Sequence, residues 1–228
     1  MAAVVTFDAG QTLVDLDLDF LARRLGERGA HVSVDALQRA APAAWLRYDA
    51  LTAAGVGHPW KELMTTLLDG AGVRAAAALA GWLFDEQPRA NLWRKPIAPM
   101  VELAKELGAR GVKVAVLSNS EGGLADLFDE IGLAPLFLTI VDSGRIGIEK
   151  PDPRIFAHTL EQVGGGEPAR AVHIGDSWSA DVKGALGAGW RAIYYPSRAA
   201  KAPAMDDPRV RVAHTADDAR AALSDFGV

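Results

Sequence analysis

Four short polar segments of the sequence carry carboxylate, hydroxyl and ammonium side chains, which can act as nucleophiles, acids, bases or metal ligands. In chain order they are Phe7-Asp8-Ala9-Gly10-Gln11-Thr12-Leu13, Leu117-Ser118-Asn119, Lys150-Pro151-Asp152-Pro153, and Gly175-Asp176-Ser177 followed by Asp181. Each segment alone has an ordinary explanation as a helix cap, a turn or a surface charge. All four in one chain, each after an apolar run or at the start of a helix, indicate a shared site.

Phosphoryl transfer is the chemistry that this set of groups fits. Its transition state is loose and highly charged, so cations and backbone donors stabilise it more than elaborate side chains do. We expect Asp8 to attack phosphorus and form an aspartyl phosphate. Lys150, Ser118 and Asn119 are the expected binders of the phosphoryl oxygens, together with the backbone amides after Asp8 and Ser118.

A metal ion is expected because Asp8 and an incoming phosphate would otherwise repel each other. Asp8 and Asp176 supply the hard oxygen ligands that Mg²⁺ prefers. Asp181 is expected either as a further ligand or as an anchor for the groups around the ion. The predicted cofactor is therefore Mg²⁺.

Apolar runs without helical periodicity precede three of the polar segments, as is typical of buried parallel strands. Helical patterns separate these runs. Strands that alternate with helices of this length predict an α/β fold with a Rossmann-like, doubly wound parallel sheet. The polar groups then meet at the carboxyl edge of the sheet, where open α/β sheets bind ligands. The expected strands are 4–7, 112–117, 171–174, 191–195 and 210–213, and the expected helices are 100–109, 123–131, 153–163, 180–186 and one capped by Thr215.

Residues 15–96 have a different pattern, rich in Ala, Leu and Arg and with helical spacing of apolar residues. They hold no convincing strand, and we expect an all-helical cap domain there. The core domain is then discontinuous and consists of residues 1–14 and 97–228. Pro42 is expected to break a helix or to begin one. Surface loops are expected at 55–59 and 197–208.

Composition excludes several classes of protein. The 228 residues include 24 Lys and Arg against 29 Asp and Glu, and the net charge of -5 is not gathered in long blocks. Nucleic acid and membranes are therefore not expected partners. The expected partner is a small phosphorylated molecule, as the chemistry of the polar segments indicates. The chain contains no Cys, which excludes a thiolate nucleophile. A cytoplasmic protein is the expectation, and the oligomeric state stays open.

The segments FDAGQTL, LSNS, GIEKPDPRIF and HIGDSWSAD, in this order, resemble the four motifs of the haloacid dehalogenase (HAD) superfamily. The resemblance implies a Rossmann-like core with a helical C1-type cap inserted after the first motif. It also implies that Asp8 is the nucleophile, that Ser118 and Lys150 bind phosphate, and that Asp176 binds Mg²⁺. At position 10 the family uses a main-chain carbonyl as a metal ligand, and Gly10 retains one.

The chain departs from HAD phosphatases at position 10, where they usually carry a second Asp as the acid and base. Gly10 cannot move a proton, and general acid-base catalysis contributes about a hundredfold to ten-thousandfold in rate. If the protein is a phosphatase, it therefore requires a substrate with a good leaving group or another proton carrier, such as Gln11 or the substrate itself.

Three alternatives remain open beside the phosphatase. A phosphonatase-like enzyme would need a cap lysine for a Schiff base, and Lys61 is the one lysine well inside the expected cap. A dehalogenase-like enzyme needs no metal, which fits Gly175-Asp176 less well. In a third class, the protein binds a phosphorylated ligand or a partner without useful turnover.

Overall fold

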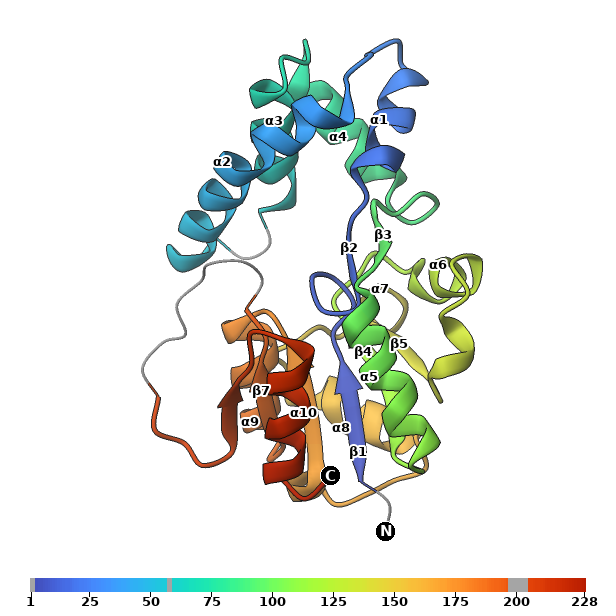
Figure 1. Cartoon of the computed structure of the whole chain (residues 1–228), viewed down its shortest axis with the longest axis vertical. Helices are drawn as coiled ribbons and strands as arrows, with labels where there is room; N and C mark the ends of the chain where they lie inside the picture. Colours follow the sequence, from blue (N-terminus) through green and yellow to red (C-terminus); the bar gives the residue numbers. More distant parts are fainter. Residues whose placement is uncertain (1–2, 57–58, 197–204) are drawn as a thin grey trace. The chain divides into compact units, whose positions relative to one another are not determined.

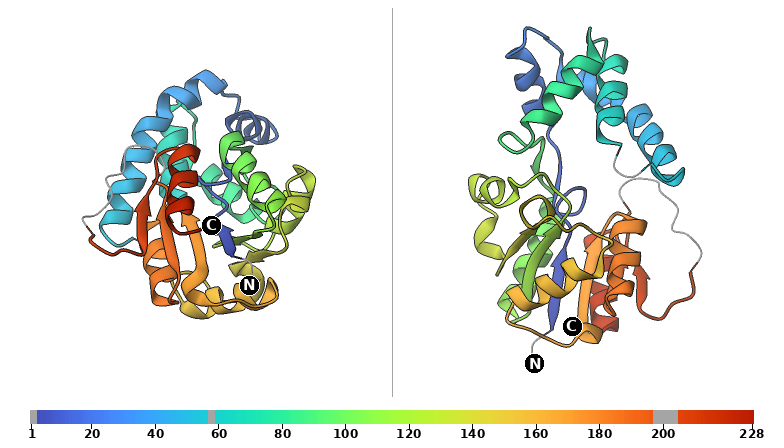
Figure 2. Two further views of the ribbon diagram at one scale, coloured as in Figure 1. Left: turned by 60° about the horizontal axis from the view of Figure 1, so that its bottom comes forward. Right: turned by 180° about the vertical axis from the view of Figure 1, so that it is seen from behind.

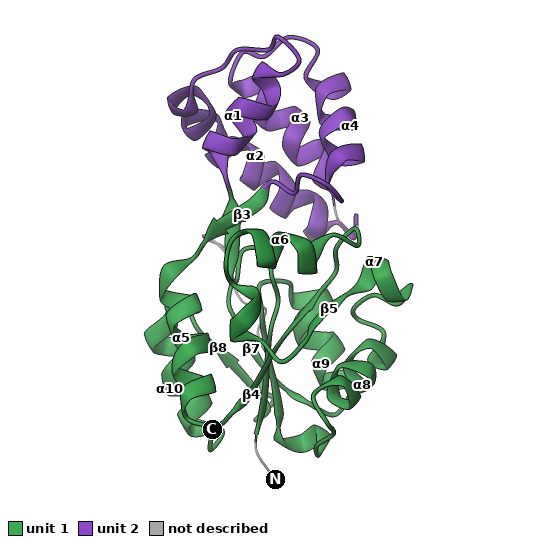
Figure 3. Cartoon of the chain, turned by 90° about the vertical axis from the view of Figure 1, so that its right-hand side faces the viewer, with its two compact units in different colours: residues 1–16, 93–228 green, residues 17–92 purple. Residues whose placement is uncertain are grey.

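The computed structural model describes residues 3–56, 59–196 and 205–228. The chain divides into two compact units (Figure 3), one formed by Met1–Leu16 with Trp93–Val228 and the other by Asp17–Leu92. Each unit is described by itself. Of the two expected surface loops, residues 57–58 and 197–204 lie outside the described part of the chain.

The first unit is built on a six-stranded sheet in the order β5-β4-β1-β6-β7-β8, and every neighbouring pair is parallel. All four residues of β1 are buried, as expected for a strand covered on both faces. The predicted α/β class with a parallel sheet is confirmed. The strands are β1 (Val4–Phe7), β4 (Lys113–Ser118), β5 (Ile140–Asp142), β6 (Ala171–Gly175), β7 (Arg191–Tyr194) and β8 (Val210–Val212).

Helices cover both faces of this sheet (Figures 1 and 2). Side chains alternate between the faces along a strand, so Val5 and Phe7 pack in one core and Val4 packs in the other. The first core includes α5 (Ala98–Ala109), α6 (Leu124–Glu130) and α10 (Ala216–Asp225). The second includes α8 (Pro153–Gln162) and α9 (Lys183–Gly187), with the short α7 (Ser143–Ile146) beside it. Single 3-10 turns occur at Ala134–Leu136 and Pro168–Arg170.

The helix starts follow the capping residues. Asp152 accepts from the amide of Arg154 at the start of α8, and Thr215 forms a capping box at the start of α10. The helix expected at 180–186 differs, because Trp178–Val182 is a π-helical turn that leads into α9. This wider turn closes with the amide of Val182 on the carbonyl of Ser177 at 3.3 Å.

The second unit consists of α1 (Leu18–Gly26), α2 (Val34–Ala53), α3 (Trp60–Gly70) and α4 (Ala76–Glu86). The expected break at Pro42 was wrong, since α2 runs through it. Buried Leu37 and Ala44 on either side of Pro42 hold the helix in the core of this unit, which offsets the missing amide hydrogen bond. Among the described residues, no helix combines the length and apolar character that crossing a bilayer requires.

The two ends of the insertion form strands, contrary to the expectation of no strand in this region. β2 (Val14–Leu16) pairs antiparallel with β3 (Trp93–Pro96) as a separate two-stranded sheet. This pair belongs to the first unit, so the units divide after residues 16 and 92, whereas the sequence suggested 14 and 96. Strands of only three or four residues are too short to show a hydrophobic period in the sequence, and β2 and β3 are far apart along the chain.

Candidate active site

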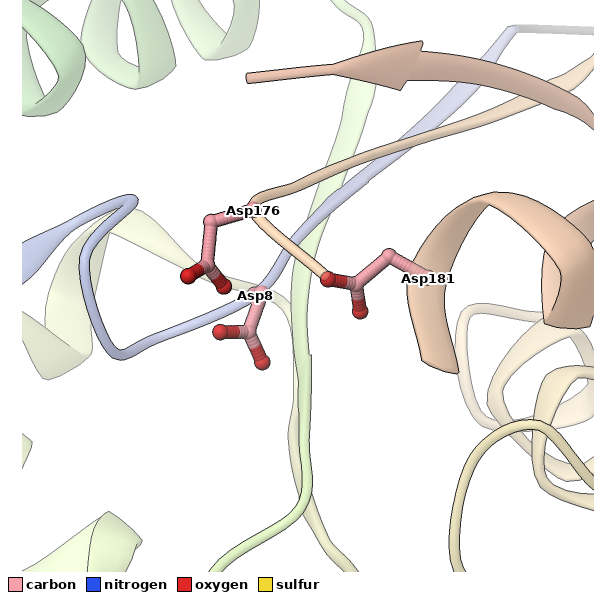
Figure 4. Close-up of side chains that lie close together, drawn as sticks. All are labelled: Asp8, Asp176 and Asp181. Atoms are coloured by element: carbon pink, nitrogen blue, oxygen red, sulfur yellow. The ribbon is translucent and has the colours of Figure 1, made fainter. Parts of the chain in front are cut away.

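Three strand ends bring the expected polar groups to one edge of the sheet. Asp8 follows β1, Ser118 ends β4 and Asp176 follows β6, and β4 and β6 flank β1 on its two sides. This is the point at which the strand order reverses, where α/β sheets form their binding crevice. Figure 4 shows the carboxylates of Asp8, Asp176 and Asp181 gathered there, and one oxygen from each lies within 4.8 Å of the other two. The three residues can together hold a metal ion.

Lys150 lies buried among these acids, with 2% of its side chain exposed. Its Nζ donates to Asp8 Oδ1 at 2.7 Å, to Asp181 Oδ1 at 2.6 Å and to the Leu117 carbonyl at 2.9 Å. Burial alone would lower the pKa of Lys150, but the charges of Asp181 and Asp8 raise it above its ordinary value. The ammonium is therefore a fixed positive charge against Asp8.

Asn119 positions Lys150 through the main chain. Its side-chain Nδ2 donates to the Lys150 carbonyl at 3.0 Å, and its Oδ1 accepts from the Lys150 amide at 2.8 Å. Both ends of the Asn119 amide thus contact the backbone of Lys150. A contact from Asn119 to phosphate, as expected from the sequence, stays a prediction beside this positioning role.

Asp181 is bound on both carboxylate oxygens. Oδ1 accepts from Lys150 and lies 3.0 Å from His173 Nε2, while Oδ2 accepts from the Ser177 amide at 2.7 Å. Burial would raise the pKa of Asp181, but Lys150 and His173 together hold it well below its usual range. These contacts favour Asp181 as the anchor of Lys150, and its direct binding to a metal stays a prediction.

The pKa of Asp176 shifts in the opposite direction to that of Asp181. Burial and the charges of Asp8 and Asp181 raise its pKa well above the ordinary value, and Lys150 offsets only part of this effect. Three carboxylates share one ammonium in this cluster. Such an excess of negative charge favours the binding of a cation.

Gly175 is required by the close approach of Asp181. A Cβ at position 175 would lie 2.3 Å from the Asp181 Cγ and Oδ2. We expect Gly175→Ala to displace this carboxylate and to lower the free energy of unfolding by about 1 to 3 kcal/mol. Gly187→Ala is the matched control, because a Cβ there meets nothing within 4 Å. Equal thermal melts for the two variants and the wild type would show that the carboxylate is not held against Gly175.

Three buried polar residues at the site escaped the sequence analysis. Thr6 and His173 are register partners in β1 and β6, and Thr6 Oγ1 lies 2.8 Å from His173 Nδ1. Asp142, at the end of β5, accepts from the amides of Gly122 and Leu124 and so holds the loop after Asn119. The sequence did contain a signal for these residues, since each is a polar residue inside, or at the end of, an otherwise apolar run.

The turn after Asp8 places its unusual backbone at Gln11. Gln11 has a φ of 58°, whereas Gly10 has no positive φ. The amides of Leu13 and Val14 both donate to the Ala9 carbonyl at 2.9 Å, which closes the turn. A left-handed residue with a side chain costs of order 1 kcal/mol or more, and this is typical of functional turns.

Lys61, the alternative Schiff-base residue, belongs to the second unit. Its side chain is exposed and its Nζ lies 4.5 Å from the centre of the Phe84 ring. This is an ordinary cation-π contact on a helix surface. No described contact of Lys61 marks it as a nucleophile.

Strand order, helix placement and the acidic cluster with its lysine define an α/β protein with an enzyme-like site at the carboxyl edge of its sheet. The chain belongs to the haloacid dehalogenase-like hydrolase family, whose sequence model matches residues 2–189. The resemblance stated from the four motifs is thereby confirmed.

Similar proteins include both named phosphatases and proteins named by family alone. The chain is 34% identical over 164 residues to haloacid dehalogenase-like hydrolase domain-containing protein 3 of Bos taurus, covering 67% of this chain and 64% of that protein. It is 33% identical over 205 residues to a phosphoserine phosphatase of Thermus thermophilus, covering 78% and 79%. The crystal structure of the putative HAD-hydrolase YfnB from Bacillus subtilis, bound to magnesium, matches with a TM-score of 0.69 at 19% identity, covering 97% and 98%. The last comparison supports the fold.

Proposed function

We propose that the protein is a Mg²⁺-dependent phosphatase of a small phosphorylated metabolite, with Asp8 as the nucleophile. The observation that carries this proposal is the buried ammonium of Lys150, 2.7 Å from Asp8 Oδ1, at an edge that also holds Asp176. A lone carboxylate would repel a phosphate dianion, and this arrangement lowers that repulsion. The similarity to a named phosphoserine phosphatase supports the same class of reaction.

The first step is attack by an Asp8 oxygen on phosphorus. The new O–P bond forms as the bond from phosphorus to the leaving oxygen breaks, and a proton must reach that oxygen. Water then attacks the aspartyl phosphate, which releases inorganic phosphate and restores Asp8. Lys150 neutralises charge throughout, and Ser118 with nearby amides binds the phosphoryl oxygens.

The donor set of the cluster fits Mg²⁺. Asp8 and Asp176 would hold the ion with the Gly10 carbonyl, while Asp181 anchors Lys150. The bound ion would supply positive charge that lowers the repulsion between Asp8 and the phosphate. The single ammonium of Lys150 does not balance the three carboxylates of the cluster. The remaining negative charge favours the binding of a cation.

Removal of metal tests this assignment. With a panel of phosphorylated metabolites and an aryl phosphate, we expect turnover with Mg²⁺ and loss of at least about a hundredfold after exhaustive chelation, restored by added Mg²⁺. Release of inorganic phosphate is the measurement. Full activity after chelation would reject the metal-dependent phosphatase and favour a dehalogenase-like reaction.

Gly10 should slow the two half-reactions unequally. An aryl phosphate has a good leaving group and needs little acid, but hydrolysis of the aspartyl phosphate still needs an activated water. Rapid mixing should therefore show a burst of phenol that approaches one per active site, followed by slow turnover. Gly10→Asp should speed the slow phase by about tenfold or more.

The backbone at position 10 is compatible with a residue that has a Cβ. Gly10 has no positive φ, and a Cβ there would lie 3.4 Å from the Trp93 Cδ1, an ordinary contact. Gly10→Asn is the matched control, since it has the same shape but cannot move a proton. A wild type without a burst, or equal rates for the Asp and Asn variants, would show that another group already moves the proton.

A further inference from the structure

A buried histidine contacts Asp181, the carboxylate that binds the proposed catalytic lysine. His173 is fully buried in β6, with Nδ1 2.8 Å from Thr6 Oγ1 and Nε2 3.0 Å from Asp181 Oδ1. The Phe156 ring packs against the imidazole in a T-shaped contact, with ring centres 5.5 Å apart and planes at 90°. The imidazole thus contacts Thr6 and Asp181 through its two nitrogens and packs against the Phe156 ring.

The partners of His173 define its tautomer. An ionised Asp181 accepts only, so the proton facing it must be on Nε2. With this proton on Nε2, Nδ1 of a neutral ring can accept from the Thr6 hydroxyl, and burial lowers the pKa of His173, which favours the neutral ring. A neutral ring can donate to Asp181 without adding a second cation beside Lys150. Thr6, His173, Asp181 and Lys150 then form one continuous chain of hydrogen bonds that ends at Asp8.

We infer that His173 is a positioning residue for the proposed reaction: through its Nε2 proton it fixes Asp181 Oδ1, which in turn holds the Lys150 ammonium against Asp8. The inference rests on the proposed role of Lys150. Two donors on one oxygen leave that carboxylate a single orientation, because its other oxygen is tied to the Ser177 amide. Loss of the Nε2 donor would let the carboxylate turn and Lys150 follow it.

Two substitutions separate positioning from packing. In His173→Gln, the terminal amide nitrogen reaches about the position of Nε2 and can still donate to Asp181. In His173→Asn, the shorter amide reaches about the position of Nδ1 and can contact only Thr6. Both variants lose the same ring and its packing against Phe156, so a purely structural role predicts equal effects.

The test uses the full chain with Mg²⁺ and an aryl phosphate. We expect kcat to fall about tenfold or more in His173→Asn and to stay within about threefold of the wild type in His173→Gln, with smaller changes in KM. Melting temperatures should fall by similar amounts in both. Equal losses of kcat in the two variants would overturn the inference.

Nuclear magnetic resonance gives a readout that does not require turnover. With ¹⁵N-labelled histidine, the His173 ring should carry its proton on Nε2. With ¹⁵N-labelled lysine, the buried Lys150 ammonium should give a slowly exchanging signal that is assigned by its absence in Lys150→Met. This signal should persist in His173→Gln and disappear in His173→Asn.

The two readouts keep the inference separate from the proposed function. A wild type that hydrolyses no phosphate ester but shows the expected resonances would reject the phosphatase and retain the positioning of Lys150. A proton on Nδ1, or a Lys150 signal unchanged in His173→Asn, would overturn the positioning role whatever the activity.

Discussion

Asp8→Asn should abolish turnover, with a loss of at least about ten-thousandfold in kcat, because the amide cannot form the aspartyl phosphate. The variant should remain folded, since Lys150 keeps Asp181 as its charged partner. The measurement is phosphate release in the presence of Mg²⁺ on any substrate that the wild type hydrolyses. This result would also separate an enzyme from a protein that only binds phosphorylated ligands.

A matched control shows whether the loss is specific to Asp8. Asp129→Asn makes the same change of a carboxylate to an amide at an exposed position of α6 and should behave as the wild type. Activity of Asp8→Asn equal to that of Asp129→Asn, in preparations of equal purity, would show that Asp8 is not the nucleophile.

Removing Lys150 and removing the charge of Asp176 should change stability in opposite directions. From the sequence alone, both are polar residues at the carboxyl edge of the predicted sheet, so neither is expected to contribute much to the core. In the structure, Lys150→Met leaves the buried carboxylate of Asp181 without its cation, so the free energy of unfolding should fall by about 3 to 5 kcal/mol. Turnover should also be lost. Asp176→Asn should raise the melting temperature of the metal-free protein, because it relieves repulsion from Asp8 and Asp181.

The pH dependence gives this prediction a second measurement. The folded pKa of Asp176 lies above its ordinary value of 3.8, so the folded protein binds more protons than the unfolded chain between these two values. The contribution of Asp176 to stability therefore becomes less favourable as pH rises through that window. The difference in melting temperature between Asp176→Asn and the wild type should accordingly grow with pH. A difference that stays constant from acid to neutral pH would contradict the repulsion.

The sheet was predictable because its buried strands are short apolar runs that end at polar residues. The runs at 4–7 and 171–174 correspond to β1 and β6 with little error. β5 was missed, since Ile140–Asp142 is three residues long and lies at the edge of the sheet. The π-helical turn was missed because its bond from the Val182 amide to the Ser177 carbonyl leaves no sequence pattern that differs from that of an α-helix.

The grouping of the site residues was accessible from their order, but the supporting contacts were not. Asp8, Lys150 and Asp176 each follow a strand or precede a helix, and a parallel sheet brings such positions together. The contact between Thr6 and His173 depends on the register of β1 against β6, which one sequence does not contain. The contact between Asp181 and Lys150 likewise depends on distances that the sequence does not contain.

The β2–β3 pair makes the helical unit an exchangeable module. Leu16 and Trp93 are register partners, so the chain leaves and re-enters the sheet unit at neighbouring points. The entropic cost of closing a loop rises only slowly with the length of the loop. The length of the insert therefore has little effect on the stability of the core unit. Evolution or a designer can therefore graft a different insert between these two residues while keeping the order of the six strands.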